Sequence, residues 1–346
     1  NSLMSNIPES IGKCKDLKEI DLSNNQISGR IPRNLSGDNL TNLTILNLSN
    51  NKLSFLFGEK IGSLITLKEL YLHNNELSGT ISPNLETLIN LEILTLGCND
   101  FTGDIPAWIG DSLKLLRHLD IGINHLTGNI PINFSNLIKL QSLNVSDNEL
   151  SGQIPKESLI TLTRLKTLDL SENKFDGRIP NIFRRFSSLT ELDLSCNKLS
   201  GEIPASAMGM MGALQANRLH QHQDQDRLHE MHQVRINISR NEGLKLPEKI
   251  EYLGVSLVKI DIESSSLVGQ LPLGLSCLHR LHEITLQDND LDGEIQTADI
   301  IPFFRKLKVH STSNFSKSDA SVGKTSNKKG GDVKRGTSES KTNSSR

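Results

Sequence analysis

The chain repeats one short pattern at nearly constant spacing, and this repetition constrains its fold more than any other feature. The clearest copy is "LKTLDLSENKFDGRIP", Leu165 to Pro180. Its residue types recur at the same offsets from Leu17, Leu91, Leu116, Leu140 and Leu189, while copies from Leu43 and Leu67 keep only the first half. The marker asparagines between Asn1 and Asn197 lie 24 to 26 residues apart. A fixed period of this length predicts an array of stacked units.

Each copy has the composition of a strand followed by an inward turn. Two leucines separated by one residue place both side chains on one face of a short strand. One strand cannot bury that face alone, whereas stacked neighbours form a parallel sheet over a shared aliphatic core. The asparagine that follows can satisfy backbone groups that the turn leaves unpaired inside the molecule. We therefore predict a repeat solenoid of the α/β type, held together by a ladder of asparagines.

The period divides the chain into five segments. Residues 1–204 contain a half unit and eight units of about 24 residues, 205–232 are an irregular His- and Gln-rich insertion, and 233–296 contain one weak and two good units. Residues 297–310 are a weak C-terminal end, and 311–346 are a basic, Ser- and Lys-rich tail with the composition of a disordered segment. The opening "NSLMSNIP" aligns with "NKFDGRIP", which predicts that this chain is a fragment starting within a repeat.

Composition and charge narrow the function classes. The formal net charge of −2 argues against nucleic acid as the partner of the whole chain. No run of 18 apolar residues predicts a membrane span, and the first residues do not form a signal peptide. The four cysteines are far apart and form neither a zinc motif nor an evident disulfide framework. Cys98 and Cys196 lie four units apart, about 19 Å, so we expect both to be free thiols.

The pattern LxxLxLxxNxLSGxIP, from about Asn1 to Gln296, resembles the plant-type leucine-rich repeat. The resemblance implies a right-handed solenoid with the main parallel sheet on its concave side and a second small sheet formed by the SGxIP segments. It also implies a non-catalytic recognition module, similar to the extracellular region of a plant receptor-like kinase or receptor-like protein in signalling or defence. No kinase motif, paired-cysteine cap or membrane span occurs in this sequence, so we expect no enzymatic activity.

The resemblance leaves two alternatives open. The chain is also similar to secreted leucine-rich-repeat inhibitors of cell-wall-degrading enzymes, and a truncated gene product without independent function would have the same pattern. The resemblance implies a protein or peptide ligand, with a co-receptor as a second partner, at the cell surface or outside the cell. We expect no cofactor and no nucleic acid.

Candidate binding residues lie between the two strand leucines and directly beside them. Most of this column is Asp or Asn, the default of the family, so departures carry more information. Tyr71, His73, Thr95 and His118 depart from the default on neighbouring units and predict an anchor for a ligand, although drift on an exposed sheet would produce the same departures. Acidic residues in later units favour a basic ligand. The predicted binding residues are Tyr71, His73, Thr95, His118, Asp120, Asp169 and Asp193.

Other motifs receive weaker interpretations. The "SVGKT" at Ser321 to Thr325 lacks the first glycine of a phosphate-binding loop, because Ser318 stands in its place. The histidines at 220, 222, 229 and 232 lie in a Gln-rich, apolar-poor segment, so we predict no metal site. Nine Asn-x-Ser/Thr sequons occur, and the glycosylation candidates singled out are Asn34, Asn42, Asn133, Asn144 and Asn237.

Overall fold

The computed structural model describes residues 3–54, 61–204, 207, 234–247, 257–269, 281, 283–291 and 306–308. The chain divides into one unit from Asn1 to Phe315 and a second from Ser316 to Arg346, and every described residue belongs to the first. Most of the predicted insertion, its four histidines, Cys277, "SVGKT" and the basic tail lie outside the described residues.

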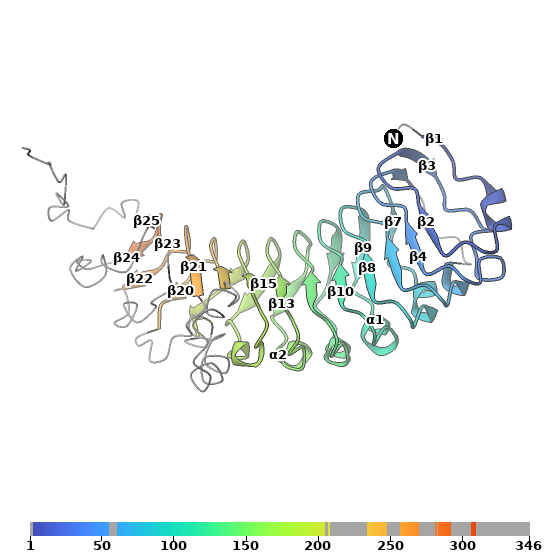
Figure 1. Cartoon of the computed structure of the whole chain (residues 1–346). Coiled ribbons are helices and arrows are strands. Elements are labelled where there is room, and N and C mark those ends of the chain that lie inside the picture. The colour runs from blue at the N-terminus through green and yellow to red at the C-terminus, as the bar shows by residue number, and fades with distance from the viewer. Residues whose placement is uncertain are drawn as a thin grey trace, which may run out of the picture. The chain divides into compact units, whose positions relative to one another are not determined.

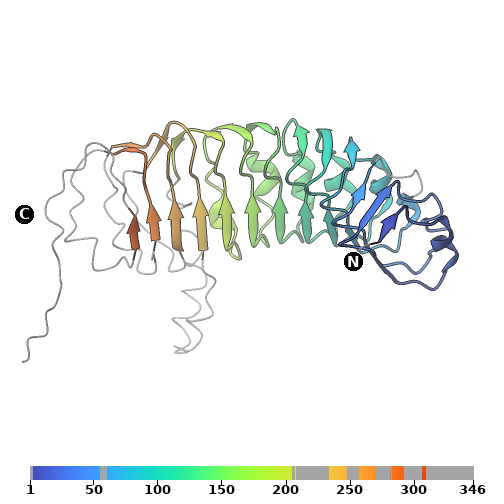
Figure 2. The same cartoon turned by 90° about the horizontal axis from the view of Figure 1, so that it is seen from above.

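The described residues form a main sheet of 12 parallel strands in sequence order, one from each unit (Figure 2). The predicted solenoid with a parallel sheet is confirmed. The strands are β2 (Glu19–Asp21), β4 (Ile45–Asn47), β6 (Glu69–Tyr71), β8 (Ile93–Thr95), β10 (His118–Asp120), β12 (Ser142–Asn144), β14 (Thr167–Asp169), β16 (Glu191–Asp193), β19 (Val234–Asn237), β21 (Leu257–Asp261), β23 (Glu283–Thr285) and β25 (Lys306–Lys308). The last of these lies in the segment that the sequence marks only as a weak end.

The SGxIP segments form a second layer, which is divided into several small parallel sheets instead of one (Figure 1). Three of these have three strands: β1 (Met4–Ser5), β3 (Gln26–Gly29) and β5 (Lys52–Leu53); β7 (Ser78–Gly79), β9 (Asp100–Asp104) and β11 (His125–Thr127); β13 (Ser151–Gln153), β15 (Lys174–Gly177) and β17 (Lys198–Leu199). Two pairs follow: β18 (Gly201–Glu202) with β20 (Leu244–Lys245), and β22 (Val268–Gly269) with β24 (Asp290–Leu291).

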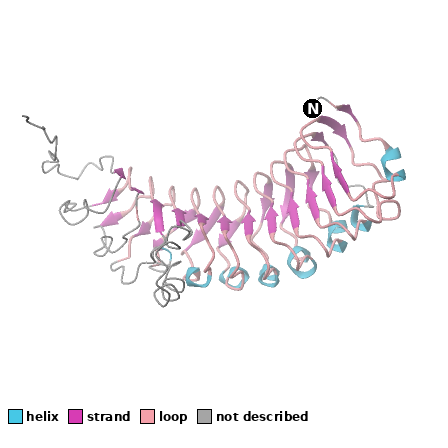
Figure 3. Cartoon of the chain, viewed as in Figure 1, coloured by secondary structure: helices cyan, strands magenta, loops and turns pink. Residues whose placement is uncertain are grey.

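Single-turn helices connect the second layer to the next main strand, on the side away from the main sheet (Figure 3). They are the α-helices α1 (Trp108–Ser112) and α2 (Lys156–Leu159) and the 3₁₀ helices Glu9–Lys13, Ile61–Ser63, Pro83–Thr87, Ile132–Asn136 and Phe183–Arg185. Among the described residues, none of the helices has both the length and the apolar character needed to cross a bilayer.

The core consists of the repeated aliphatic residues, as the period predicts. Leu165, Leu168 and Leu170 of one unit are all at most 1% exposed, and their counterparts in the neighbouring units are buried in the same way. Among the described residues, five phenylalanines are also buried in this core, and two of them, Phe183 and Phe186, pack edge to face with ring centroids 5.9 Å apart. The core therefore runs from unit to unit without interruption.

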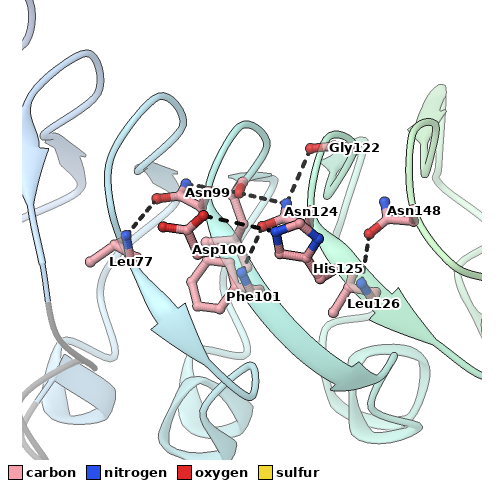
Figure 4. Close-up of polar contacts among 10 residues, drawn as sticks. Leu77, Asn99, Asp100, Phe101, Gly122, Asn124, His125, Leu126 and Asn148 are labelled. Atoms are coloured by element: carbon pink, nitrogen blue, oxygen red, sulfur yellow. Dashed lines mark hydrogen bonds and ion pairs between the residues drawn. The ribbon is translucent and has the colours of Figure 1, made fainter.

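The asparagines after the strands form the predicted ladder (Figure 4). Asn124 Nδ2 donates to the carbonyl of Leu96 in the preceding unit at 3.2 Å, and to two carbonyls of its own turn at 3.1 Å each. Its Oδ1 accepts from the backbone N–H of Phe101, also in the preceding unit, at 3.0 Å. Each ladder asparagine thus joins two units. The same bonds recur at Asn51, Asn75, Asn99, Asn148, Asn173, Asn197, Asn241 and Asn289.

The first described residues take part in the ladder as well. The backbone N–H of Leu3 donates to Asn25 Oδ1 at 3.1 Å, which is the bond that Phe175 makes to Asn197. Met4 and Ser5 pair with Gln26 and Ile27 in the second layer. Leu3 therefore occupies the same position in its repeat that Phe175 occupies in its own.

The ninth unit, with strand β19, pairs regularly with the unit before it and irregularly with the unit after it. Strand β19 pairs with β16 in full register, so the insertion between them leaves the main sheet unbroken. The next step is weaker, because Ser265 stands in the ladder position: its Oγ donates to Glu263 O at 3.0 Å and reaches Ile238 O of the preceding unit only at 3.5 Å. The pairing of β19 with β21 also shifts register between Val234 and Arg235.

The residue before each ladder asparagine adopts a left-handed backbone conformation. Asn is favoured there, as in Asn74 with φ 54°, but Cys98, Ile123 and Cys196 also have φ 54°. The two cysteines are free thiols, as expected from their separation. Ile123 is a β-branched side chain that is 49% exposed, so it is strained and gains little burial in return.

Core depth can be tested within one unit. Leu168→Ala should lower the free energy of unfolding by about 2–5 kcal/mol, because it leaves a cavity in the shared core. Arg164→Ala, at an exposed position of the same unit, should change it by less than about 0.5 kcal/mol. Urea denaturation followed by circular dichroism measures both, and equal losses at the two positions would contradict the register.

The ladder can be tested in both directions. Asn124→Ser should lower the free energy of unfolding by about 3 kcal/mol, because serine leaves the buried groups of Phe101 and Leu96 without partners. Ser265→Asn should raise it by about 1 kcal/mol by restoring the missing bonds. Hydrogen exchange should show faster exchange at Phe101 in the first variant. The exposed Asn136→Ala serves as the control, and a loss there as large as at Asn124 would show that the ladder has no special role.

Candidate binding surface on the main sheet

In most units the residue between the two strand leucines, which ends the main strand, closes the turn that follows it. Asp169 Oδ1 accepts from the backbone N–H of Ser171 at 3.0 Å and from its hydroxyl at 2.6 Å. Asp193 binds Ser195 in the same way, and so do Asn47 with Ser49 and Asn144 with Ser146. The frequent Asp or Asn followed by Leu-Ser or Val-Ser is thus explained by the fold itself.

Three neighbouring units depart from this turn. The Tyr71 hydroxyl donates to Glu69 Oε2 at 2.8 Å, and its ring meets His73 edge on, with centroids 6.4 Å apart. His73 Nδ1 lies 2.8 Å from Thr95 Oγ1 on the next strand. The structure therefore brings together the predicted residues Tyr71 and Thr95, at the ends of β6 and β8, and His73, in the turn after β6. We call these three residues the aromatic group.

Burial sets the protonation of the aromatic group. It raises the pKa of Tyr71 to about 12, with the hydrogen bond to Glu69 adding to the effect, so the phenol keeps its proton at neutral pH. Burial also lowers the pKa of His73, against the opposing effect of the Asp120 carboxylate. The group is thus an uncharged aromatic surface with polar atoms at its edge, a combination common in binding anchors.

Asp120, on the following strand, lacks the serine of the usual turn. Its Oδ1 accepts from the backbone N–H of Gly122 at 3.1 Å. A Cβ at Gly97 would lie 2.9 Å from Asp120 Oδ1, so the carboxylate rests over this glycine of the preceding unit. Burial raises the pKa of Asp120, while the Gly122 N–H, His73 and a hydrogen bond from the Asn144 side chain act in the opposite direction. His118 lies two residues earlier on β10 and is exposed, paired across the sheet with Ile93 and Ser142.

A shallow groove of about 470 Å³ continues along the sheet from β12 to β21. It contains two of the predicted acidic residues, Asp169 and Asp193, which are register partners on β14 and β16. Thr167 also lines it, half-buried, with its hydroxyl 2.6 Å from Ser142 Oγ. The neighbouring strand thus shields part of the Thr167 side chain from solvent.

Carboxylates outnumber cations in the groove. Four carboxylates, Asp169, Glu191, Asp193 and Asp261, line it together with two cations, Arg235 and Lys259. Lys259 Nζ lies 2.9 Å from Asp261 Oδ2 and 3.6 Å from Glu283 Oε1, and Arg235 Nη1 lies 3.8 Å from Glu191 Oε1. Burial raises the pKa of Asp169 against the two hydrogen bonds from Ser171, and the carboxylates of Asp193 and Asp120 add to the increase. The groove therefore has an excess of negative charge, although both cations are already paired.

The sequon asparagines differ in how accessible their amide nitrogens are. Asn34 and Asn42 are exposed. Asn133 Nδ2 donates to both carboxylate oxygens of Asp111 at 2.8 Å, and Asn237 Nδ2 donates to Asp193 Oδ2 at 3.0 Å. Asn144 is half-buried in its own turn with Ser146. Within the described ranges, no three His, Cys, Asp or Glu side chains are arranged to hold a metal ion.

Models of the leucine-rich repeat match residues 16–37, 42–64, 66–88, 89–150 and 152–199, which together are about half of the chain. No curated protein sequence matches. Many solved structures do, and those of plant receptors cover most of this chain.

The plant peptide hormone receptor RGFR1 in complex with RGF2 is 30% identical to this chain, with a TM-score of 0.71 over 90% of this chain and 49% of the receptor. The Arabidopsis receptor kinase HAESA, in complex with the peptide hormone IDA and the co-receptor SERK1, is 28% identical, with a TM-score of 0.68 over 87% and 50%. The ectodomain of GASSHO1/SCHENGEN3 from Arabidopsis thaliana, in complex with CASPARIAN STRIP INTEGRITY FACTOR 2, is 26% identical, with a TM-score of 0.61 over 90% and 43%. The chain thus spans about half the length of these relatives.

Glycosylation provides a test of the surface assignment. When the chain is secreted from a eukaryotic host, we expect glycans at Asn34 and Asn42, because their side chains are exposed to the transferase. We expect none at Asn133 or Asn237, whose amide nitrogens are engaged by carboxylates, and none at the half-buried Asn144. Peptide mapping after glycosidase treatment identifies occupied sites by mass. Occupancy at Asn237 with Asn34 and Asn42 empty would contradict the accessibility argument.

Proposed function

The chain belongs to the leucine-rich-repeat family, and we propose that it is a recognition module that binds a peptide, or an extended segment of a protein, along its main sheet. The observation that carries this proposal is the continuity between the aromatic group, at the ends of β6 and β8, and the groove over β12 to β21. Strand β10 joins the two. An extended ligand that crosses the strands would contact an aromatic anchor first and an acidic groove afterwards.

The two ends of this surface suit different parts of such a ligand. The aromatic group presents a phenol ring and an uncharged imidazole, and the phenol hydroxyl and the imidazole Nδ1 are already hydrogen-bonded, so the group favours an apolar or aromatic side chain. The groove presents Asp and Asn side chains whose oxygens can accept hydrogen bonds from main-chain N–H groups of the ligand. Its excess of carboxylates disfavours an acidic ligand through like-charge repulsion.

The relatives support the same class of ligand. The solved structures of RGFR1 and HAESA are complexes of receptors with peptide hormones, and the HAESA complex also contains a co-receptor. By this likeness we propose that the chain is the ligand-binding region of a receptor in plant signalling, located outside the cell, with a co-receptor as a second partner. It performs no catalysis itself in this proposal.

A variant of the aromatic group tests the proposal. A random 12-residue peptide library displayed on phage is panned against the full chain, and retained peptides are synthesised and measured by interferometry. Replacing Tyr71 and His73 by Ala should weaken these peptides about 30-fold, as expected for an anchor that contributes about 2 kcal/mol. Thermal melting should change little, because both side chains lie on the surface of the sheet.

Lys156→Ala, on α2 at the opposite side of the unit, is the matched control and should leave affinity unchanged. A larger loss for Lys156→Ala than for the Tyr71 and His73 variant would place binding on the outer surface and refute the proposal. Inhibition of a cell-wall-degrading hydrolase by the chain, with no retained peptide, would instead favour an inhibitor.

A further inference from the structure

The main sheet has two long edges, one where its parallel strands begin and one where they end (Figure 2). The amino edge consists of the two residues before the first leucine of each unit and the residue after that leucine. The carboxyl edge consists of the residues on either side of each ladder asparagine. Backbone hydrogen bonds fix both rows: the Arg117 N–H donates to Glu92 O at 2.8 Å, and the Asn99 N–H donates to Ile123 O at 3.2 Å. Equivalent residues of consecutive units therefore lie in line along each edge.

The two edges carry opposite charge in the four units that contain strands β6, β8, β10 and β12. The amino edge of these units has one carboxylate, Glu92, and four cations: Lys68, Lys114, Arg117 and Lys139. The carboxyl edge has no lysine or arginine and four carboxylates: Glu76, Asp100, Asp147 and Glu149. The four cations and the four carboxylates of the carboxyl edge are all exposed.

Most of these charges have no ionic partner in the part of the chain that the structure describes. Arg117 Nε lies 3.1 Å from Glu92 Oε2, and Lys174 Nζ lies 2.8 Å from Glu149 Oε2. His125 Nε2 lies 4.0 Å from Asp100 Oδ1. No ion pair among the described residues engages the other five: Lys68, Lys114, Lys139, Glu76 and Asp147.

Both edges also expose isoleucine in these four units. Ile65, Ile89 and Ile138 occupy the same position of the amino edge and are 56% to 58% exposed. Three other units have a small polar residue at this position: Thr41, Thr163 and Ser187. On the carboxyl edge, Ile123 is exposed and has a left-handed backbone conformation that does not suit its β-branched side chain. The fold therefore does not account for these isoleucines.

The two edges are complementary to each other in the same four units. Cations facing carboxylates attract, whereas two copies of the same edge would repel each other. Apolar residues surrounded by charged ones are also the usual composition of a protein interface. A second copy placed alongside with its strands parallel would bring its carboxyl edge against the amino edge of the first. We propose that copies of this chain associate side by side through these two edges, in a heterologous contact.

The complementary stretch is short. In the next unit the amino edge carries Arg164 and Lys166, but the carboxyl edge carries Lys174 beside Glu172, so the match in charge ends there. Towards the start of the chain, Asn42 lies on the amino edge one unit before Ile65, and a glycan there would limit the contact. Neighbouring strands are only about 4.8 Å apart, so four units make a small interface and the association should be weak.

Neither edge includes the aromatic group or the residues that line the groove. Side-by-side association would therefore leave the proposed peptide surface on the main sheet open. The inference is independent of the proposed function, and either can fail without the other.

Sedimentation velocity of the full chain tests the proposal. The sedimentation coefficient should rise with protein concentration at low salt, and this rise should disappear in about 1 M NaCl, where charges are screened beyond about 3 Å. An amino-edge variant combines Ile89→Thr with Lys139→Glu, and a carboxyl-edge variant combines Ile123→Asn with Glu76→Lys. Each should weaken self-association by about tenfold or more. Thermal melting checks that both variants fold, which we expect because all four positions are exposed.

A mixture of the two variants separates this interface from any other. The amino-edge variant keeps an intact carboxyl edge, and the carboxyl-edge variant keeps an intact amino edge. Their equimolar mixture should therefore form dimers with the affinity of the natural chain and no larger species, whereas the natural chain can extend beyond a dimer. Ile132→Thr combined with Lys156→Glu is the matched control. Both residues are exposed on the helical side of the units, so this variant should associate like the natural chain.

Several results would overturn the proposal. A natural chain that remains monomeric in low salt at its highest soluble concentration has no such interface. Association that persists in either edge variant, or that the control variant loses to the same extent, belongs to another surface. Two variants that are monomeric alone and remain monomeric when mixed would also contradict a contact between unlike edges.

Failure of peptide binding would leave these sedimentation results unchanged.

Discussion

The hydrogen bonds of the ladder asparagines join each unit of the solenoid to the unit before it. Main strands of three residues pair only briefly, and the chain then turns inward with carbonyl and N–H groups that water does not reach. Asn124 satisfies three such carbonyls and one N–H at once, across two units. No other short side chain offers two donors and an acceptor in this arrangement, since aspartate has no donor and serine has only one. The constant period of the sequence follows from the need to place this amide at the same point of every turn.

This requirement also explains how much of the molecule could be predicted. The strand leucines, the ladder and the weak ninth unit follow from spacing alone, and Ile236, Ile238 and Asn241 occupy the places that the spacing assigns. The strand at Lys306–Lys308 has only a single leucine between two lysines, so its sequence barely differs from that of a loop. The division of the second layer into small sheets was not predictable either, because it depends on the pairing of strands of only two to five residues.

The binding surface was predictable in its location but not in its details. Tyr71, His73 and Thr95 stand out as departures from the default, yet their mutual hydrogen bonds depend on side-chain conformations on two strands. His118 departs equally in sequence but is an exposed residue at the start of β10, so residue type alone could not separate it from the others. Gly97 and Gly122 carried a signal that was available: two consecutive glycines in a column of serines. Their meaning emerges only when the carboxylate of the next unit is seen to rest over the first of them.

The unbroken pairing of β16 with β19 has a consequence for how such an array tolerates change. Leu199 and Leu194 bond to Asn241 just as neighbouring units bond elsewhere, although residues 205–233 intervene in sequence. The stacking of two units thus requires the correct hydrogen-bond register and does not depend on the number of residues that connect them. The Ala207–Val234 interval is therefore a natural point of domain insertion, where a fluorescent protein or an affinity handle could be fused internally. A reporter placed there would travel with the solenoid while both termini and the whole main sheet remained as they are.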